Sequence, residues 1–380
     1  MGISKHIVTN NPRLKRIGEC IIISEYETGK IKFANIAIDR NKKSVSDIYE
    51  ELEGYLLESD FTIINQFLFG MEKHEINNRR NAKKYFNGLK WPVTVIKQEP
   101  LNGDCEWGSI ISAVSNVNLS PIIEDTEVIG NYFEDDYAGY YIFGGLTPGN
   151  SGESNIQQSR HSFEILEKSL GNLGMDIYNL ARTWFYLDDL LSWYDDFNVV
   201  RNEYFRNKGV LERVIPASTG IGAANLKKNA LLIGGYAMRQ KQNGVEIIPV
   251  DSPYQCPASD YKSSFSRAVE IIHPEYRHLI ISGTASITSD GESAHIGDID
   301  KQVEMTMKVV QGILNSREMT WENVTRGVAY IKNRNDINSL NKFCIEKNLP
   351  LLPLSTIQAD ICRDELLFEI EVDAVSINKI

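Results

Sequence analysis

Apolar and polar residues alternate near the C-terminus of the chain, over residues 366–374, and this pattern predicts a β-strand. Its apolar positions would face a core, because successive side chains of a strand point to opposite faces. Glu369, Glu371 and Asp373 would share the other face, where like charges repel one another. This face is either solvated outer surface or the wall of a cleft that holds an acid.

The same order of predicted elements occurs twice when the chain is compared with itself. Residues 174–187 and 318–331 share a methionine, an asparagine, an arginine and a tyrosine at a constant offset of 144. A predicted strand and an amphipathic helix precede each segment, and a second helix and a closing strand follow it. The order β–α–β–α–β–β, with helices on one face of a sheet, predicts an α+β fold with units at residues 126–250 and 251–380.

Residues 1–125 show a weaker form of this order, with strand-like runs before and after one helical stretch but without a clear residue match. We interpret them as a diverged N-terminal α/β unit. A chain of 380 residues is too long for one ordinary core, which agrees with a division into several units.

Composition narrows the classes of partner. The net charge of −11 disfavours nucleic acid, since phosphate binding depends on Lys and Arg. No apolar run reaches about 18 residues, so we expect no membrane span or membrane partner. Five dispersed cysteines without a CxxC motif indicate free thiols in a reducing compartment, which makes the cytoplasm the expected location.

No motif indicates a cofactor or a metal. The chain contains neither GxGxxG nor GxxxxGK, so no nucleotide is implied. His295, Asp298 and Asp300 form a weak set of metal ligands, and capping of the following helix by Asp298 or Asp300 is the favoured interpretation. We therefore expect no cofactor and no metal.

Several motifs together resemble the RidA/YjgF superfamily and, within it, the chorismatase group, whose members act on chorismate. They lie between about residues 130 and 380 and include PASTGIG (216–222), SSFSRA (263–268), ISGTASI (281–287), HIGD (295–298) and CRDELLFEIE (362–371). The resemblance implies tandem RidA-like (chorismate mutase-like) units of a sheet plus helices. Such units usually meet as trimers, so the chain either imitates a trimer within itself or forms a homo-oligomer.

The repeat supplies an internal control for the acidic strand. Aligning residues 231–236 with 366–371 places Gly234 opposite Glu369, so only the second copy has a carboxylate there. A carboxylate that the fold requires would be expected in both copies, which favours a chemical role for Glu369. Glu371, opposite Tyr236, is the weaker candidate. The resemblance implies that Glu369 occupies the position of the chorismatases' catalytic glutamate.

Cleavage of the enolpyruvyl ether of chorismate needs a proton on the methylene carbon, and a carboxylic acid that stays protonated suits this step. The two carboxylates of chorismate need cations, preferably arginines. We expect Arg267 and Arg363 to bind substrate, and Arg182 and Arg201 are the next candidates. The alternative for each arginine is an ion pair at the protein surface. Arg182 recurs as Arg326 in the second copy, which favours a shared structural role, whereas Arg267 has no counterpart.

Three further residues complete the predicted site. Cys362 precedes Glu369 across a short turn, either as a catalytic thiol and pocket wall or as a small buried apolar residue. The resemblance implies that Cys362 and Ala285 shape the pocket and influence the product. It also brings the proline-rich loop of Tyr254 close to the pocket.

Three functions remain open, each with a small-molecule carboxylate as the predicted partner. The first is a chorismatase-like lyase or hydrolase that releases pyruvate. The second is a RidA-like deaminase of enamines or imines, weakened because Ser355 or Thr356 stands where those enzymes carry an arginine. The third is another small-carboxylate enzyme or binding protein of a biosynthetic pathway, since the acidic pairs 188–189 and 195–196 would repel a dianion near the pocket mouth.

Overall fold

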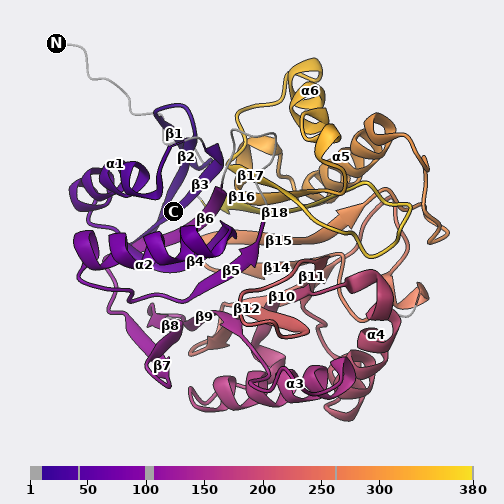
Figure 1. Cartoon of the computed structure of the whole chain (residues 1–380), viewed down its shortest axis with the longest axis horizontal. Coiled ribbons are helices and arrows are strands. Elements are labelled where there is room, and N and C mark those ends of the chain that lie inside the picture. The colour runs from indigo at the N-terminus through magenta and orange to yellow at the C-terminus, as the bar shows by residue number, and fades with distance from the viewer. Residues whose placement is uncertain (1–10, 42, 99–106, 262, 379–380) are drawn as a thin grey trace.

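The computed structural model describes residues 11–41, 43–98, 107–261 and 263–378 (Figure 1). Their strands form three mixed sheets of six strands each. The first sheet has the order β1-β2-β3-β6-β4-β5, and its elements are β1 (Arg13–Ile17), β2 (Ile21–Thr28), β3 (Ile31–Asn41), β4 (Thr62–Gly70), β5 (Val93–Lys97) and β6 (Trp107–Ser115), with helices α1 (Val45–Glu58) and α2 (Glu72–Phe86). We call this sheet and its helices the first unit.

The second and third units repeat this arrangement. The second has the order β11-β10-β12-β9-β8-β7, with β7 (Ser120–Glu124), β8 (Glu127–Glu134), β9 (Ala138–Leu146), β10 (Leu180–Leu187), β11 (Ala217–Gly222), β12 (Leu231–Gln240), α3 (Asn155–Gly171) and α4 (Leu190–Asn207). The third has the order β13-β14-β15-β18-β16-β17, with β13 (Glu246–Val250), β14 (Ala268–Ile272), β15 (Tyr276–Ala285), β16 (Val324–Ile331), β17 (Leu354–Gln358), β18 (Phe368–Ile377), α5 (Ile299–Ser316) and α6 (Ser339–Glu346). Short 3-10 turns are η1 (Ile177–Asn179), η2 (Val210–Glu212), η3 (Ala258–Tyr261), η4 (Trp321–Asn323) and η5 (Arg334–Asp336).

The asparagine that recurs in the repeat has the same structural task in both copies. Asn179 Oδ1 accepts a hydrogen bond from the Asp176 backbone at 2.9 Å, and its Nδ2 donates to Met238 O at 3.1 Å. Asn323 likewise accepts from the Thr320 backbone at 2.9 Å and donates to Val375 O at 3.0 Å. Each side chain therefore closes the 3-10 turn before a central strand and ties it to the neighbouring closing strand.

Helix starts follow the residues that the sequence offers as caps. Ser44 and Ser154 form capping boxes at α1 and α3, which satisfy backbone donors that a helix terminus leaves open. Asp298 caps α5 by accepting a hydrogen bond from the Lys301 backbone at 3.1 Å. The expected capping role of Asp298 is therefore confirmed.

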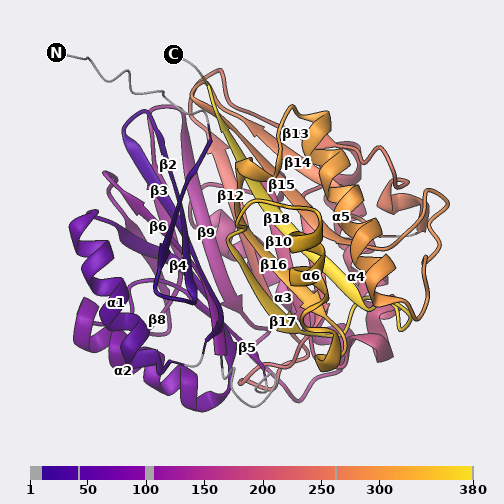
Figure 2. The same cartoon turned by 90° about the horizontal axis from the view of Figure 1, so that it is seen from above.

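The three units close into a ring. The parallel edge strand of each sheet contacts the next sheet, with β5 against β9, β11 against β15 and β17 against β3. The helix pairs lie on the outside at three separate places, as Figure 1 shows, and Figure 2 shows α1 and α2 on the side opposite α5 and α6. One apolar core lies in each unit beneath its helices, and two further clusters fill the space between sheets.

The predicted α+β class with tandem sheet-plus-helices units and a pseudo-trimeric arrangement is therefore confirmed. The N-terminal unit is a complete six-stranded sheet, although its sequence carries only a weak trace of the repeat. The boundaries proposed after residues 125 and 250 stay a prediction. In the structure β7 already pairs with β8 of the second unit, and β13 pairs with β14 of the third. Within the described ranges, no helix is both long and apolar enough to cross a membrane.

Candidate active site

Both faces of β18 are buried. Its apolar side chains pack beneath α5 with the core of the third unit, as the alternation predicts. Glu369, Glu371 and Asp373 face the interior of the ring and are 5%, 0% and 8% exposed. The interpretation of this face as solvated outer surface is therefore wrong. Carboxylates so deeply buried need partners or protons to offset the loss of water.

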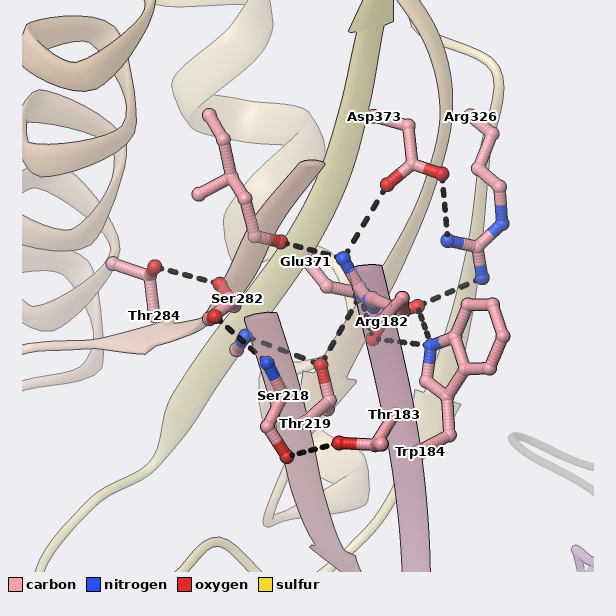
Figure 3. Close-up of polar contacts among 12 residues, drawn as sticks. Arg182, Thr183, Trp184, Ser218, Thr219, Ser282, Thr284, Arg326, Glu371 and Asp373 are labelled. Atoms are coloured by element: carbon pink, nitrogen blue, oxygen red, sulfur yellow. Dashed lines mark hydrogen bonds and ion pairs between the residues drawn. The ribbon is translucent and has the colours of Figure 1, made fainter. Parts of the chain in front are cut away.

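Glu371 and Asp373 pair with two arginines, Arg182 of the second unit and Arg326 of their own unit (Figure 3). Arg182 lies 2.5 Å from Glu371 and 3.3 Å from Asp373, and Arg326 lies 2.7 Å and 3.5 Å from the same carboxylates. Trp184 Nε1 donates to both oxygens of Glu371 at 3.0 Å. Burial works against ionisation of Glu371, but the two guanidinium groups outweigh it and hold the pKa of this carboxyl below its usual value. We call these four charged residues the ion cluster.

Arg182, one of the residues predicted to bind substrate, belongs to the ion cluster instead. Arg182 is 1% exposed and also donates to Ile281 O at 2.9 Å and to Thr219 Oγ1 at 3.2 Å. It does not line the pocket that Glu369 lines. The recurrence of Arg182 and Arg326 in the two copies is explained by the cluster, because both neutralise the same pair of acids.

Glu369 lines a pocket of about 140 Å³ between the second and third units, which we call the acid pocket. Helix α4 and strand β11 form one wall, and β15, β18 and the segments around residues 263–267 and 362–363 form the other. The described lining residues are Tyr194, Asp195, Asn198, Arg201, Ser218, Gly220, Ser263, Phe265, Arg267, Gly283, Ala285, Ile287, Cys362, Arg363 and Glu369. Tyr194 and Phe265 are the aromatic residues of this lining, and Trp184, which donates to Glu371, lies outside it.

A bulge in β15 makes room for the acid. The register between β15 and β18 shifts between Ile281 and Thr284, and Ala285 then pairs with Glu369. Gly283 lies at this irregularity, and a Cβ at that position would come within 2.0 Å of Glu369 Oε1. Gly283 N donates to Thr219 Oγ1 of the second unit at 3.1 Å, which fixes the backbone beside the acid. Only glycine allows the carboxyl group to lie this close to the strand.

The surroundings keep Glu369 protonated. Burial raises the pKa of Glu369 to about 8, the negative charge of Glu371 acts in the same direction, and Arg267 opposes both. A carboxyl group with this pKa carries its proton at neutral pH, while Glu371, two residues away on the same strand face, stays ionised. The pair therefore combines a proton donor with a fixed negative charge, a division of roles common where carboxyl groups do acid chemistry.

Three arginines bring positive charge to the acid pocket. Arg267 Nε donates to Cys256 O at 2.9 Å, Arg201 donates to Asn198 Oδ1 at 2.6 Å, and Arg363 donates to Ser293 Oγ at 3.2 Å. With Glu369 neutral, Asp195 on the rim is the one negative charge among the described lining residues. The lining then carries an excess of two positive charges, which suits a dianion.

Cys362 and Ala285 form part of the apolar wall beside Glu369, as part of a cluster with Ile287, Ile361 and Leu366. Burial raises the pKa of the Cys362 thiol to about 12, and the nearby Glu369 acts in the same direction. The thiol therefore stays protonated at neutral pH and is a poor nucleophile. Tyr254 is 44% exposed, lines a separate groove beside α5 and lies outside the acid pocket.

The register of the sheets corrects the alignment of the two copies. Arg182 pairs with Tyr236 and Arg326 pairs with Asp373, so the closing strands correspond at an offset of 137. Gly234 therefore corresponds to Glu371, and the counterpart of Glu369 is Leu232. The alignment of Gly234 with Glu369 is wrong by two residues, although the first copy still lacks a carboxylate at this position.

Several lining residues were not predicted, including Tyr194, Asn198, Ser218, Phe265 and Gly283. Ser218, Phe265 and Gly283 lie inside the PASTGIG, SSFSRA and ISGTASI segments, so the motifs already contained the signal. Tyr194 and Asn198 come from α4, on the same helix as Arg201. A search for polar and aromatic residues near Arg201 at helical spacing would have indicated them.

Comparison with known proteins points to one group. No protein-family model matches the chain. A chorismatase from Streptomyces hygroscopicus is 26% identical over 61% of this chain and 71% of its own length. A chorismatase from Streptomyces rapamycinicus is 28% identical over 53% of the chain, and a 3-hydroxybenzoate synthase from Streptomyces hygroscopicus is 24% identical over 55% of it, and each match spans 65% of the relative.

A chorismatase crystal structure superimposes with a TM-score of 0.61, covering 82% of this chain and 93% of that protein at 19% identity. The predicted similarity to the chorismatases is confirmed. The chorismatase structure shares the fold over most of both chains. The sequence matches span about two thirds of the chorismatase relatives, so what those proteins do bears on this chain only as a hypothesis.

Proposed function

We propose that this chain is a chorismatase-like enzyme that cleaves the enolpyruvyl ether of chorismate, or of a related cyclic carboxylate, and releases pyruvate. One observation carries the proposal: Glu369 is buried at the wall of a pocket that is also lined by Arg201, Arg267 and Arg363, and this burial raises its pKa to about 8. The similarity to proteins named chorismatase supports the choice of substrate.

The reaction needs an acid and a water molecule, but no oxidant and no cofactor. Glu369 donates its proton to the methylene carbon of the enol ether, and the ether oxygen stabilises the resulting cation as an oxocarbenium ion. The Glu369 carboxylate, with Glu371 behind it, then stabilises this cation and accepts a proton from the attacking water. The hemiketal that forms then collapses as its hydroxyl proton passes to the departing ring oxygen, which gives pyruvate and the ring alcohol and leaves Glu369 protonated for the next turnover.

The other lining residues hold the substrate. Arg267, Arg363 and Arg201 bind its two carboxylates, because planar guanidinium groups match carboxylate geometry. Cys362 and Ala285 contact the ring and limit the space around it, so that Cys362 acts as a wall rather than as a nucleophile. Arg182 contributes indirectly, by keeping Glu371 ionised next to the acid.

The test is release of pyruvate from chorismate, followed through NADH consumption by lactate dehydrogenase. Wild type should release pyruvate, and Glu369→Gln should lose at least about 100-fold because the amide has no acidic proton. Glu304→Gln, on the exposed face of α5, is the matched control and should retain full activity. Absence of pyruvate with wild type, or an active Glu369→Gln variant, would rule the proposal out.

A second candidate is an enzyme for a related carboxylate with fewer negative charges. Asp195 on the rim of the acid pocket favours it, since this carboxylate repels a dianion on entry. If Asp195 selects against chorismate, Asp195→Asn should lower the KM for chorismate while the kcat stays within about twofold. A deaminase would instead release ammonia from 2-aminoacrylate, and ammonia release can be measured with the same protein preparations.

A further inference from the structure

The pseudo-symmetry of the ring places a second cleft at the seam between the first and second units, equivalent to the acid pocket. Strand β5 and helix α2 form one wall, and β9, β12 and the β7–β8 hairpin form the other. Its volume is about 790 Å³, against about 140 Å³ for the acid pocket. Pockets of about 300–1,000 Å³ are typical for small-molecule sites. We call it the second cleft.

Strand register relates the two sites residue by residue. The irregularities before Asn65 in β4 and before Arg182 in β10 align these strands, so that Val93 and Val95 of β5 stand where β11 has Ser218 and Gly220. All four of these β5 and β11 residues line their respective sites. The frame of the acid pocket is therefore present twice in the chain.

Two of the residues proposed to act on an anion, Glu369 and Arg267, are replaced by apolar residues in the second cleft. Leu232 stands in place of Glu369, as the register of the closing strands shows. Gly130 pairs with Phe143 in the second unit as Ala268 pairs with Ile281 in the third, so these positions correspond. The residues before them also correspond, and Ile129 therefore stands in place of Arg267.

The rim of the second cleft is acidic. Five acids and three bases line it, and each base is paired: Arg79 and Lys227 contact Glu127, and Lys168 contacts Glu124 at 2.8 Å. Glu72 and Asp125 have no ion pair within the described ranges. An anion would therefore meet negative charge at the entrance and no unengaged cation among these described lining residues.

We infer that the second cleft binds a small aromatic molecule that carries a positive charge, and that it does no acid chemistry. The ring contacts the apolar part of the lining, which includes Val95, Ile129 and Leu232, and the cationic group lies at the acidic rim. This inference goes beyond the proposed function and does not depend on it, because it rests on the register and lining of a different seam.

The test compares three probes that share one ring: 2-naphthylmethylammonium, 2-naphthylmethanol and 2-naphthoate, titrated by calorimetry into the full chain. We expect the cation to bind about tenfold more tightly than the anion, with the alcohol between them and the difference shrinking as salt is added. Val95→Arg places a cation in the cleft from the edge strand β5, and should abolish binding of the cationic probe. Ile165→Arg, from α3 on the opposite wall, should do the same if Val95→Arg fails to fold.

Ile345→Arg, at a position that is 80% exposed on α6, is the matched control and should leave binding unchanged. Both cleft variants should release pyruvate at the wild-type rate if the wild type releases it. Equal affinity for all three probes, tightest binding of 2-naphthoate, or binding of the cation that survives both cleft variants would each overturn the inference.

Discussion

The acidity of Glu369 makes a quantitative prediction for the pH dependence of the proposed reaction. With a pKa of about 8, the carboxyl group is about 90% protonated at pH 7 and about 10% protonated at pH 9. With an ordinary pKa it would be protonated in about 0.3% of molecules at pH 7. Burial and the neighbouring Glu371 therefore raise the protonated fraction of Glu369 at pH 7 about 300-fold above that of an exposed glutamate.

The value of kcat/KM for pyruvate release reports the free enzyme and should be constant from pH 6 to pH 7, then fall about tenfold between pH 7 and pH 9. The thiol of Cys362 does not interfere, since burial raises its pKa to about 12. Glu371→Gln removes the neighbouring charge and should move the midpoint to lower pH, provided that its melting curve shows a folded protein. A midpoint below pH 5, or one that Glu371→Gln leaves in place, would refute the reasoning.

Four further predictions follow from the same residues. The unfolded chain loses the Glu369 proton near pH 4.5, whereas the folded state keeps it up to about pH 8. Wild-type stability therefore falls as pH rises between these two values. The Tm advantage of Glu369→Gln over wild type should grow from pH 5 to pH 8, whereas Glu304→Gln should show no such trend. Gly283→Ala puts a Cβ within 2.0 Å of Glu369 Oε1, so pyruvate release should fall about 100-fold in a variant that circular dichroism shows to be folded. Arg182→Met leaves buried carboxylates without their full neutralisation, and urea unfolding should show a loss of about 3–5 kcal/mol. Cys362→Ala should keep pyruvate release within about threefold of wild type, and a complete loss would show that the thiol takes part in the chemistry.

The fold was predictable from the sequence where its elements are amphipathic. The helices that became α3 and α5 and the strand that became β18 bury the faces that their patterns mark as apolar. The first unit shows only a weak trace of the repeat in its sequence. A sheet covered by two helices requires the pattern of apolar and polar positions, but it does not require the particular residues that the other two units share. Asn65 stands in β4 where the other units have arginines, and the sheet forms without an ion pair at that position.

The predicted site residues divide according to what each prediction rested on. Arg267, which has no counterpart in the other copy, lies in the acid pocket, whereas Arg182, which recurs, belongs to the ion cluster. The comparison of copies therefore separated the two arginines by a physical criterion. Tyr254 was placed by its loop alone, and the sequence contains no signal for the path of a loop whose ends are anchored in β13 and β14.

The misplacement of Gly234 opposite Glu369 shows why the strand pattern alone could not identify the acid. Side chains of a strand alternate with a period of two, so a slip of two residues leaves every side chain on its own face and creates no apolar or polar mismatch. The first copy lacks a carboxylate opposite Glu369, Glu371 and Asp373 alike, so the asymmetry between copies favours none of them. What distinguishes Glu369 is that Arg182 and Arg326 pair with the other two acids, which stay ionised. Burial, and after it the charge of Glu371, then disfavours a charge on Glu369. The proton on the acid thus depends first on burial and in part on the arginines of β10 and β16, which keep Glu371 ionised.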